Sequence, residues 1–558
     1  MTGNQNLQHK WLCFFISLAA LVNLSGLCVP LMDPDAGVYA SVTKHMLQRN
    51  DWLGLYFQGT DWLDKPHFPF WITAAFFKVF GIHDWSYKLP GILFAFMGAY
   101  YTYLFAKQQY NKTIALWAAF ILLTAEHFII SNSDVRAEPF LTGLVMASVY
   151  HFSNTLSKKI GWHLVAACLF AACAVMTKGI FTLAPIGGAI AGELIIKKNW
   201  KELFHWRWLL AGVLLVLFIT PELYSLWYQF DKHPEKIVFG KTNVSGIRFF
   251  LWDSQFGRFA NSGPIKGKGD PSFFLHTLLW AFLPWSLLMY ASLIDKIRRW
   301  FGKKEDGQTG TVRPEWYTLC GSLLTLVLFS LSKFQLPYYT NIIFPFLAIL
   351  TAQYIAALTG KAERMVRPVQ NIICFILIAG MIALHFFYGP ATSFLPLFFV
   401  LAVLVFAIVL PYRIQMNKAY LILCRAGLVT LALNLYINTC FYPDLMQYQS
   451  GDEAAVYINK HHPGLPGVRM GIYSPGFEFY LKDTMMIADT NTIKDPGPAK
   501  QGTWFISEEG LDFMKQQNIR YEMIKEFPEF HVTMLTLKFI NKKRREKELK
   551  KTYLIRLL

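Results

Sequence analysis

The chain has 558 residues, of which 54% are hydrophobic and only 16% are charged, and its mean hydropathy is +0.32. A soluble domain usually carries about a quarter charged residues, so the composition argues against a soluble protein. The 48 Phe, 26 Tyr and 17 Trp exclude a disordered chain, and Trp and Tyr are common at both bilayer interfaces. The eight cysteines are scattered without a CxxC pair, which gives no sign of a disulfide framework or a thiolate zinc site.

Apolar segments of about 20 residues, the length that crosses a bilayer, recur over the first three quarters of the chain. The first of these segments lacks a small-residue cleavage site and precedes a large polytopic body, so we interpret it as a retained anchor. We therefore predict a mainly α, polytopic membrane protein with thirteen spans, at 11–31, 88–107, 113–130, 137–154, 162–178, 180–196, 207–224, 274–295, 316–332, 338–358, 370–387, 393–411 and 419–438.

Basic residues in the short loops set the orientation of these spans. With a cytoplasmic N-terminus, the inside loops carry clusters of Lys and Arg, whereas the short outside loops hold only Arg136, Lys178 and Lys333. This bias follows the positive-inside rule. Much of the net charge of +17 is thus topology signal, and no nucleic-acid partner is needed to explain it.

An odd number of spans places the C-terminus outside. Residues 1–438 would form the membrane domain and residues 439–558 an external α/β domain. Its expected strands lie at 468–475, 503–509 and 532–540, and its expected helices at 452–462 and 511–518. The basic tail at 541–551 could rest on anionic lipid headgroups. Two long loops, 32–87 and 225–273, face the same side, which we expect to carry the function.

The first outside loop begins with two carboxylates, Asp33 and Asp35, on either side of Pro34. Tyr39 and three aliphatic residues then share one face of an expected interfacial helix at 36–48. Asp35 either caps this helix or lies at the mouth of a membrane cavity.

Further ionisable groups follow at the same membrane face. Lys65 beside Asp64 is either a surface ion pair or a phosphate-binding cation. Asp134 precedes the fourth span and is either its N-cap or a functional carboxylate. Lys178 lies in an apolar setting, where it either snorkels or has a functional role.

Loop 225–273 adds Arg258, and the start of the tenth span adds Lys333, Tyr338 and Tyr339. All these groups map to the outside face. Acids able to act as a general base, beside cations able to hold an anion, indicate transfer of a group from a lipid phosphate.

Five short motifs resemble those of the GT-C glycosyltransferases of the protein O-mannosyltransferase superfamily, and most closely the lipid A aminoarabinose transferase (ArnT) type. They are Pro34-Asp35-Ala36-Gly37-Val38-Tyr39-Ala40, Asp64-Lys65-Pro66 with Trp71, Asp134, Thr177-Lys178-Gly179, and the run from Phe329 to Tyr339. The first motif departs from the family pattern, because Ala36 and Val38 replace its Glu and Arg.

The resemblance implies an inner-membrane enzyme with its active site facing the periplasm. The donor would be a sugar on a polyprenyl phosphate, and the acceptor lipid A, another envelope glycolipid or a protein hydroxyl. Asp35 would be the base and Asp134 would assist it. Four cations would hold the donor phosphate, namely Lys65 and Arg258, then Lys178 and Lys333. Asp33, Tyr39, Asp64, Tyr338 and Tyr339 would line the cavity.

In the family, an acid before Lys-Pro and a histidine in the fourth outside loop bind a metal. Here these positions hold Asp64 and Gln255, and Gln is a poor zinc ligand. We therefore expect no required cofactor. A divalent metal stays an alternative, with His67 or His233 as substitute ligands.

Two other function classes remain as alternatives. A transporter or lipid flippase would also need many spans, but it would carry repeats and mid-membrane charges, which the sequence does not display. A membrane-anchored scaffold would leave the charges at the outer face unexplained.

Overall fold

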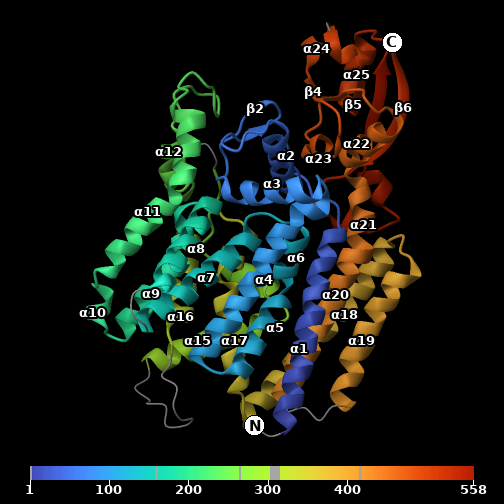
Figure 1. Cartoon of the computed structure of the whole chain (residues 1–558). Coiled ribbons are helices and arrows are strands. Elements are labelled where there is room, and N and C mark those ends of the chain that lie inside the picture. Colours follow the sequence, from blue (N-terminus) through green and yellow to red (C-terminus); the bar gives the residue numbers. More distant parts are fainter. Residues whose placement is uncertain (1–2, 158–160, 263–265, 302–314, 414–417, 495) are drawn as a thin grey trace.

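The computed structural model describes residues 3–157, 161–262, 266–301, 315–413, 418–494 and 496–558 (Figure 1). A large helical body carries a smaller α/β domain at one end, and the first helix starts at the opposite end of the body. The helices of the body and of the segments above it are α1 (Gly3–Leu24), α2 (Asp35–Gln48), α3 (Phe68–Phe80), α4 (Asp84–Gln109), α5 (Lys112–Leu123), α6 (Glu126–Ser133), α7 (Glu138–Ser157), α8 (Trp162–Lys178), α9 (Leu183–Ile196), α10 (Trp200–Leu203), α11 (Arg207–Leu226), α12 (Gly246–Arg248), α13 (Phe256–Ala260), α14 (Phe273–Ala281), α15 (Ser286–Phe301), α16 (Tyr317–Leu331), α17 (Phe344–Ala356), α18 (Gly360–Tyr388), α19 (Phe394–Arg413), α20 (Lys418–Tyr436) and α21 (Tyr442–Leu445).

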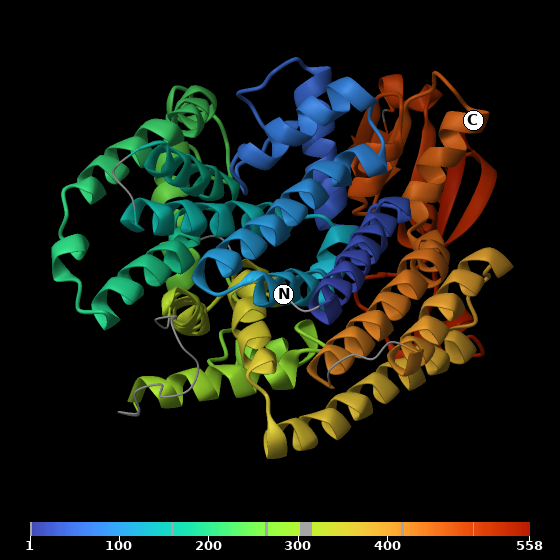
Figure 2. The ribbon, with the colours of Figure 1, turned by 60° about the horizontal axis from the view of Figure 1, so that its bottom comes forward.

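Helix α5 forms the centre of the body. It is apolar on every side, and each residue from Ile114 to Leu123 is buried, as expected of a helix enclosed by other helices. It packs against α1, α4 and α17. Figure 2 shows α1 beside α20, so helices from the beginning and the end of the body's sequence pack against each other.

Each of the thirteen expected spans falls on a helix or on two consecutive helices. Six helices in the described residues are long and apolar enough to cross a membrane, and a seventh is counted if α5 and α6, bent by 53°, form one span. Five shorter apolar helices accompany them. The chain is thus a multi-pass membrane protein, and the count of thirteen stays a prediction.

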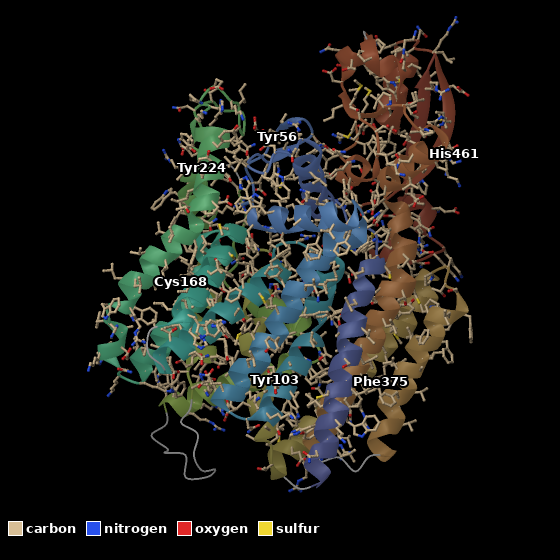
Figure 3. All side chains as sticks on the ribbon, in the orientation of Figure 1. Tyr56, Tyr103, Cys168, Tyr224, Phe375 and His461 are labelled. Atoms are coloured by element: carbon tan, nitrogen blue, oxygen red, sulfur yellow. The ribbon has the colours of Figure 1, made fainter. Side chains whose placement is uncertain are left out.

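Large apolar side chains project from the flank of the body. Phe375, labelled in Figure 3, is 71% exposed, and Phe386 on the same helix is also 71% exposed. Such a surface is unfavourable in water and suits lipid. The membrane assignment therefore rests on the outer surface as well as on helix length.

The segment between α1 and α4 covers one end of the body. Helix α2 confirms the helix predicted at 36–48, and Val38, Val42 and Met46 are buried on one face of it. That face packs on α3 and on a small hairpin of β1 (Tyr56–Phe57) and β2 (Thr60–Asp61), rather than being left free for an interface.

The C-terminal domain is α/β, as predicted. Its five strands have the order β4-β3-β5-β7-β6, with β3 parallel to β4 and β5 and with β7 antiparallel to β5 and β6. The elements of this domain are α22 (Ser450–His461), β3 (Gly467–Met470), α23 (Pro475–Tyr480), β4 (Met485–Ala488), α24 (Thr490–Lys494), β5 (Thr503–Ser507), α25 (Glu508–Gln516), β6 (Tyr521–Glu529), α26 (Leu537–Ile540) and β7 (Lys550–Leu557).

Two details of this domain differ from the prediction. The expected strand at 532–540 is a turn followed by α26, and the basic segment leads into β7 between β5 and β6. Arg545 of that segment is buried, donates to the Tyr388 carbonyl at 2.6 Å and stacks on the Tyr388 ring. The segment therefore docks on the helical body, which its charge alone did not indicate.

Candidate active site

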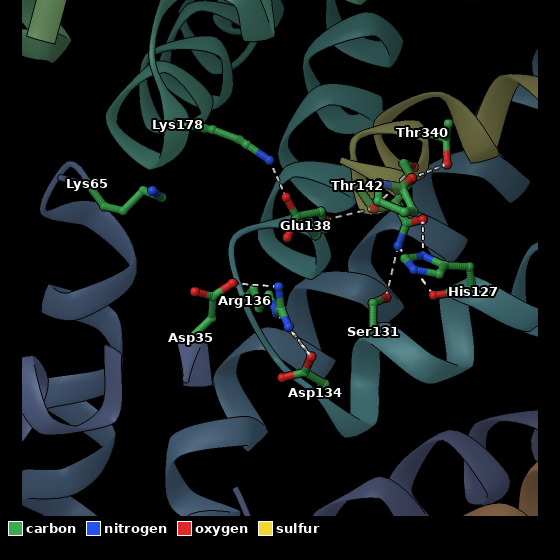
Figure 4. A network of polar contacts seen from close by, with 12 residues as sticks. Asp35, Lys65, His127, Ser131, Asp134, Arg136, Glu138, Thr142, Lys178 and Thr340 are labelled. Atoms are coloured by element: carbon green, nitrogen blue, oxygen red, sulfur yellow. Dashed lines mark hydrogen bonds and ion pairs between the residues drawn. The ribbon is translucent and has the colours of Figure 1, made fainter. Parts of the chain in front are cut away.

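Two carboxylates from distant parts of the sequence meet on one arginine. Arg136 Nη1 lies 2.5 Å from Oδ2 of Asp35, and its Nη2 lies 2.7 Å from Oδ2 of Asp134 (Figure 4). Asp35 is the first residue of α2, whose N-cap position is Pro34. Asp134 directly follows α6, and its buried Oδ1 has no hydrogen-bond partner among the residues that the structure describes. Neither carboxylate is a simple helix cap.

The second ion pair of the site joins two helix ends. Lys178, the last residue of α8, contacts the buried carboxylate of Glu138 at the start of α7. Gly179 follows with φ of 104°, a value that favours glycine and ends the helix. The lysine is therefore paired and does not snorkel to solvent.

Two tyrosines lie against these cations. Lys178 Nζ is 3.9 Å from the centre of the Tyr339 ring, and Tyr338 lies under both Arg136 and Lys178, at 4.8 and 5.3 Å. Both tyrosines belong to the 3₁₀ helix Pro337–Ile343. Their rings keep the cations close to one another while lowering the cost of like-charge contact.

A third cluster forms just before α3. Asp64 contacts both Lys65 and Arg258, and the arginine comes from α13. Although burial alone would raise the pKa of Asp64, the two cations hold that pKa below its usual value. Two cations sharing one carboxylate leave a net positive charge, which suits an incoming anion.

One cavity joins the second and third clusters. It has a volume of about 90 Å³ and is lined by Glu138, Lys178, Arg258 and Tyr339 together with apolar side chains. A smaller hollow beside it is lined by Asp64, Lys65, Lys178 and Arg258. Three predicted phosphate ligands thus surround one connected space.

Comparison with known proteins agrees with this geometry. Residues 64–225 match the family model of dolichyl-phosphate-mannose-protein mannosyltransferases. An uncharacterised protein of Aquifex aeolicus is 23% identical over 83% of this chain and 85% of its own length. An undecaprenyl phosphate-alpha-4-amino-4-deoxy-L-arabinose arabinosyl transferase of Edwardsiella ictaluri is 26% identical over 64% of this chain, but the match spans less than two thirds of that relative, 62%.

The comparison with solved structures concerns the whole fold. The crystal structure of ArnT from Cupriavidus metallidurans bound to undecaprenyl phosphate superposes with a TM-score of 0.73, covers 98% of both chains and is 16% identical in sequence. The chain has the fold of ArnT. The resemblance seen in the five sequence motifs is confirmed.

The remaining predicted site residues lie elsewhere. Asp33 points to the C-terminal domain and accepts from the Gly476 amide at 2.9 Å. Lys333 is exposed, and its neighbours Ser332 and Phe334 line the cavity in its place. Tyr39 packs between Trp62 and Phe70 on the face of α2 next to α3.

The residues expected at the metal position do not fit a divalent cation. Asp64 is already bound by two cations, and the Gln255 amide donates to the Lys178 carbonyl at 3.2 Å and to Ser254 at 2.9 Å. The substitutes fit no better, because both ring nitrogens of His67 are hydrogen bonded and His233 pairs with Glu235 on the surface. No group of three metal-binding side chains occurs among the described residues.

Two functional residues were given no role by sequence reasoning. Arg136 links both carboxylates, and Glu138 holds Lys178. Both lie with Asp134 within five positions at the edge of an apolar span, which is the signal that could have identified them. The spatial partners of those charges could not be read from the local pattern.

Proposed function

We propose that the chain transfers a sugar from a polyprenyl phosphate to an acceptor on a membrane lipid, at a site facing the periplasm. The observation that carries the proposal is the cavity shared by Lys65, Lys178 and Arg258, which lies near Asp35. The name of the Edwardsiella ictaluri relative and the lipid phosphate bound in the Cupriavidus metallidurans structure support this donor class.

The cations would bind the donor phosphate. That phosphate carries one negative charge in the donor and two after the sugar leaves, so Lys65 and Arg258 stabilise the leaving group more than the ground state. An apolar cavity of about 300 Å³ between α8, α9 and α11 is our candidate for part of the lipid tail.

Transfer would be a single displacement. An acceptor oxygen attacks the anomeric carbon, the bond from that carbon to the phosphate oxygen breaks, and polyprenyl phosphate leaves with the electron pair. Asp35 receives the acceptor proton. Its ion pair with Arg136 uses Oδ2, and we assign the proton to Oδ1, on a side chain that is 39% exposed.

Arg136 and Asp134 would position this base. Arg136 is held by Asp134 at 2.7 and 3.0 Å, so the guanidinium is fixed and orients Asp35. The buried Oδ1 of Asp134 is free to accept a hydrogen bond from the acceptor.

The experiment is a transfer assay with the purified full chain in nanodiscs. Labelled polyprenyl-phosphate sugar should be consumed only when a lipid acceptor is present, and the label should appear on that acceptor. Movement of the intact donor across the bilayer without cleavage would instead support a flippase. If a protein hydroxyl is labelled and no lipid is, the proposed transfer chemistry stands but the proposed lipid acceptor is wrong.

A further inference from the structure

A cavity larger than those at the cation cluster lies outside it. It measures about 760 Å³ and is lined by residues of the C-terminal domain and by Asp33 and Pro34 of the helical body. Pockets for small molecules generally measure about 300–1,000 Å³, so this cleft has room for one or two sugar rings. The proposed transfer reaction, as described above, makes no use of it.

The cleft lies where a mixed sheet of this kind commonly binds ligands. Strands β3 and β5 are parallel neighbours. After β3 the chain enters α23, whose Phe477 packs on Phe505 at one face of the sheet, whereas after β5 it enters α25, whose Leu511 packs with Trp504 at the other face. The connections diverge at the carboxyl ends of the two strands, which is the topological switch point of the sheet.

Residues from both strand ends line the cleft. Gly471 to Ser474 follow β3, whereas Ser507 ends β5 and Glu508 and Glu509 follow it. Gly471 has φ of 70°, so the chain can turn sharply there. Ligand-binding loops of parallel sheets are built in this way.

The lining chemistry selects the ligand class. Carboxylates outnumber the lysines in the lining. Lys551 pairs with Glu526, which does not line the cleft, and Asp512 and Glu548 likewise pair with Lys515 and Lys538 outside it. The six carboxylates are Asp33, Glu508, Glu509, Asp512, Glu529 and Glu548. Carboxylates accept hydrogen bonds from hydroxyl and amino groups but repel phosphate. Tyr473, which is 60% exposed in the same cleft, offers a flat apolar face for a sugar ring.

A buried carboxylate lies behind the lining of the cleft. Asp452 is 7% exposed and binds Gln449, a lining residue, through Oδ2 at 2.7 Å. Its Oδ1 has no partner among the residues that the structure describes.

The cleft is coupled to the proposed base. Asp33 lines it, and Asp35 follows two residues later. Lys44 of α2 is buried and donates to the carbonyls of Glu478 and Phe479 at 2.9 and 3.1 Å, which pins α2 to the end of α23. A ligand held in the cleft is therefore held at a fixed position relative to Asp35.

We propose that this cleft binds the sugar head group of the acceptor, through hydroxyl and amino groups and not through phosphate. That the bound sugar is the acceptor rests on the proposed transfer reaction, but binding of a sugar in this cleft can be tested without that reaction. Its consequence is that the head group is selected by the C-terminal domain, while the donor is selected by the membrane body.

The test measures binding of three probes to the full chain in nanodiscs by calorimetry. They are methyl glucosaminide, which is cationic, methyl glucoside, which is neutral, and glucose 1-phosphate. We expect affinity to fall in that order, with the cationic probe at least about tenfold tighter than the phosphate. The double variant Glu508→Gln/Glu509→Gln should weaken binding of the cationic probe about tenfold, and Tyr473→Ala should weaken binding of all the probes that bind.

Matched controls separate this site from the reaction. Glu522→Gln changes an exposed carboxylate on β6 outside the cleft and should leave binding unchanged. Asp35→Asn should bind the probes normally while losing transfer. Glucose 1-phosphate binding as tightly as methyl glucosaminide, or binding unaffected by the cleft variants, would overturn the site while leaving the proposed reaction standing. If the probes bind as expected but the chain transfers no sugar, the binding site stands and the proposed reaction is contradicted.

Discussion

Removing Arg258 is the perturbation whose effect can be worked out most fully. Its guanidinium is 17% exposed and shares Asp64 with Lys65 beside the cavity. In Arg258→Ala, the remaining pair of Lys65 and Asp64 is neutral. The site then loses its net positive charge as well as one donor to the phosphate.

The size of the loss follows from the charge-assisted hydrogen bond. Such a contact contributes about 1.5–3 kcal/mol, which corresponds to a fall in kcat/KM of roughly 10–150-fold. The leaving phosphate gains a charge as the sugar departs. Part of the loss must therefore appear in kcat and not only as a higher KM for the donor. Asp64→Asn should act in the opposite sense on binding and lower the donor KM, because it frees both cations.

The assay is the initial rate of transfer over a range of donor concentrations in nanodiscs. Arg248→Ala is the matched control. Arg248 lies in the same loop region, but its side chain is 75% exposed and its ion pair with Asp253 is long, at 3.6 Å. Size-exclusion chromatography shows whether each variant is folded. A folded Arg258→Ala enzyme with the native kcat and donor KM would refute the assignment of the donor phosphate to this cavity.

The other predictions concern stability. Glu138→Gln leaves Lys178 charged in a buried setting and should destabilise the chain by about 3–5 kcal/mol. Adding Lys178→Met should recover most of that loss of stability in thermal unfolding. If the losses of the two single variants instead add up in the double variant, the pairing is contradicted. Burial raises the pKa of Asp33 to about 7, and burial together with Asp33 raises the pKa of Asp452. The stability that this pair contributes is complete below about pH 4 and is lost as pH rises toward 7. The melting temperature of the native chain should therefore fall between pH 5 and pH 8. The melting temperature of Asp452→Asn should fall less over the same range. Equal slopes would show that the pair does not titrate in that range.

Sequence alone predicted the helical body well because span length and the positions of basic residues follow from the bilayer. It also predicted β3 and β5, the helix α22 before β3 and the helix α25 after β5. It failed at 532–540, an alternating apolar run that the chain uses as a turn and a short helix. The strand β7 was missed because its first residues belong to a basic run, and only pairing with β5 and β6 stabilises it there.

The types of residue in the candidate site could be predicted from the sequence, but the side chains that pair with them could not. Asp35, Lys65, Lys178 and Arg258 were singled out in the sequence because charges near apolar spans are costly. That Arg136 would link two carboxylates depends on the fold, which brings α2 to the end of α6. Lys333 was placed with the cations by its position in a motif, but it is exposed and is not among the residues that line the cavity.

The most direct test of the central claim is mass spectrometry of the reaction with the native chain and with Asp35→Asn. Both would be supplied with labelled polyprenyl-phosphate sugar and envelope lipid acceptor. We predict that one lipid gains the mass of the sugar with the native chain and that the folded variant produces none. A folded Asp35→Asn chain that labels the lipid at the native rate would contradict the assignment of the base, and a native chain that consumes no donor would contradict the proposed reaction.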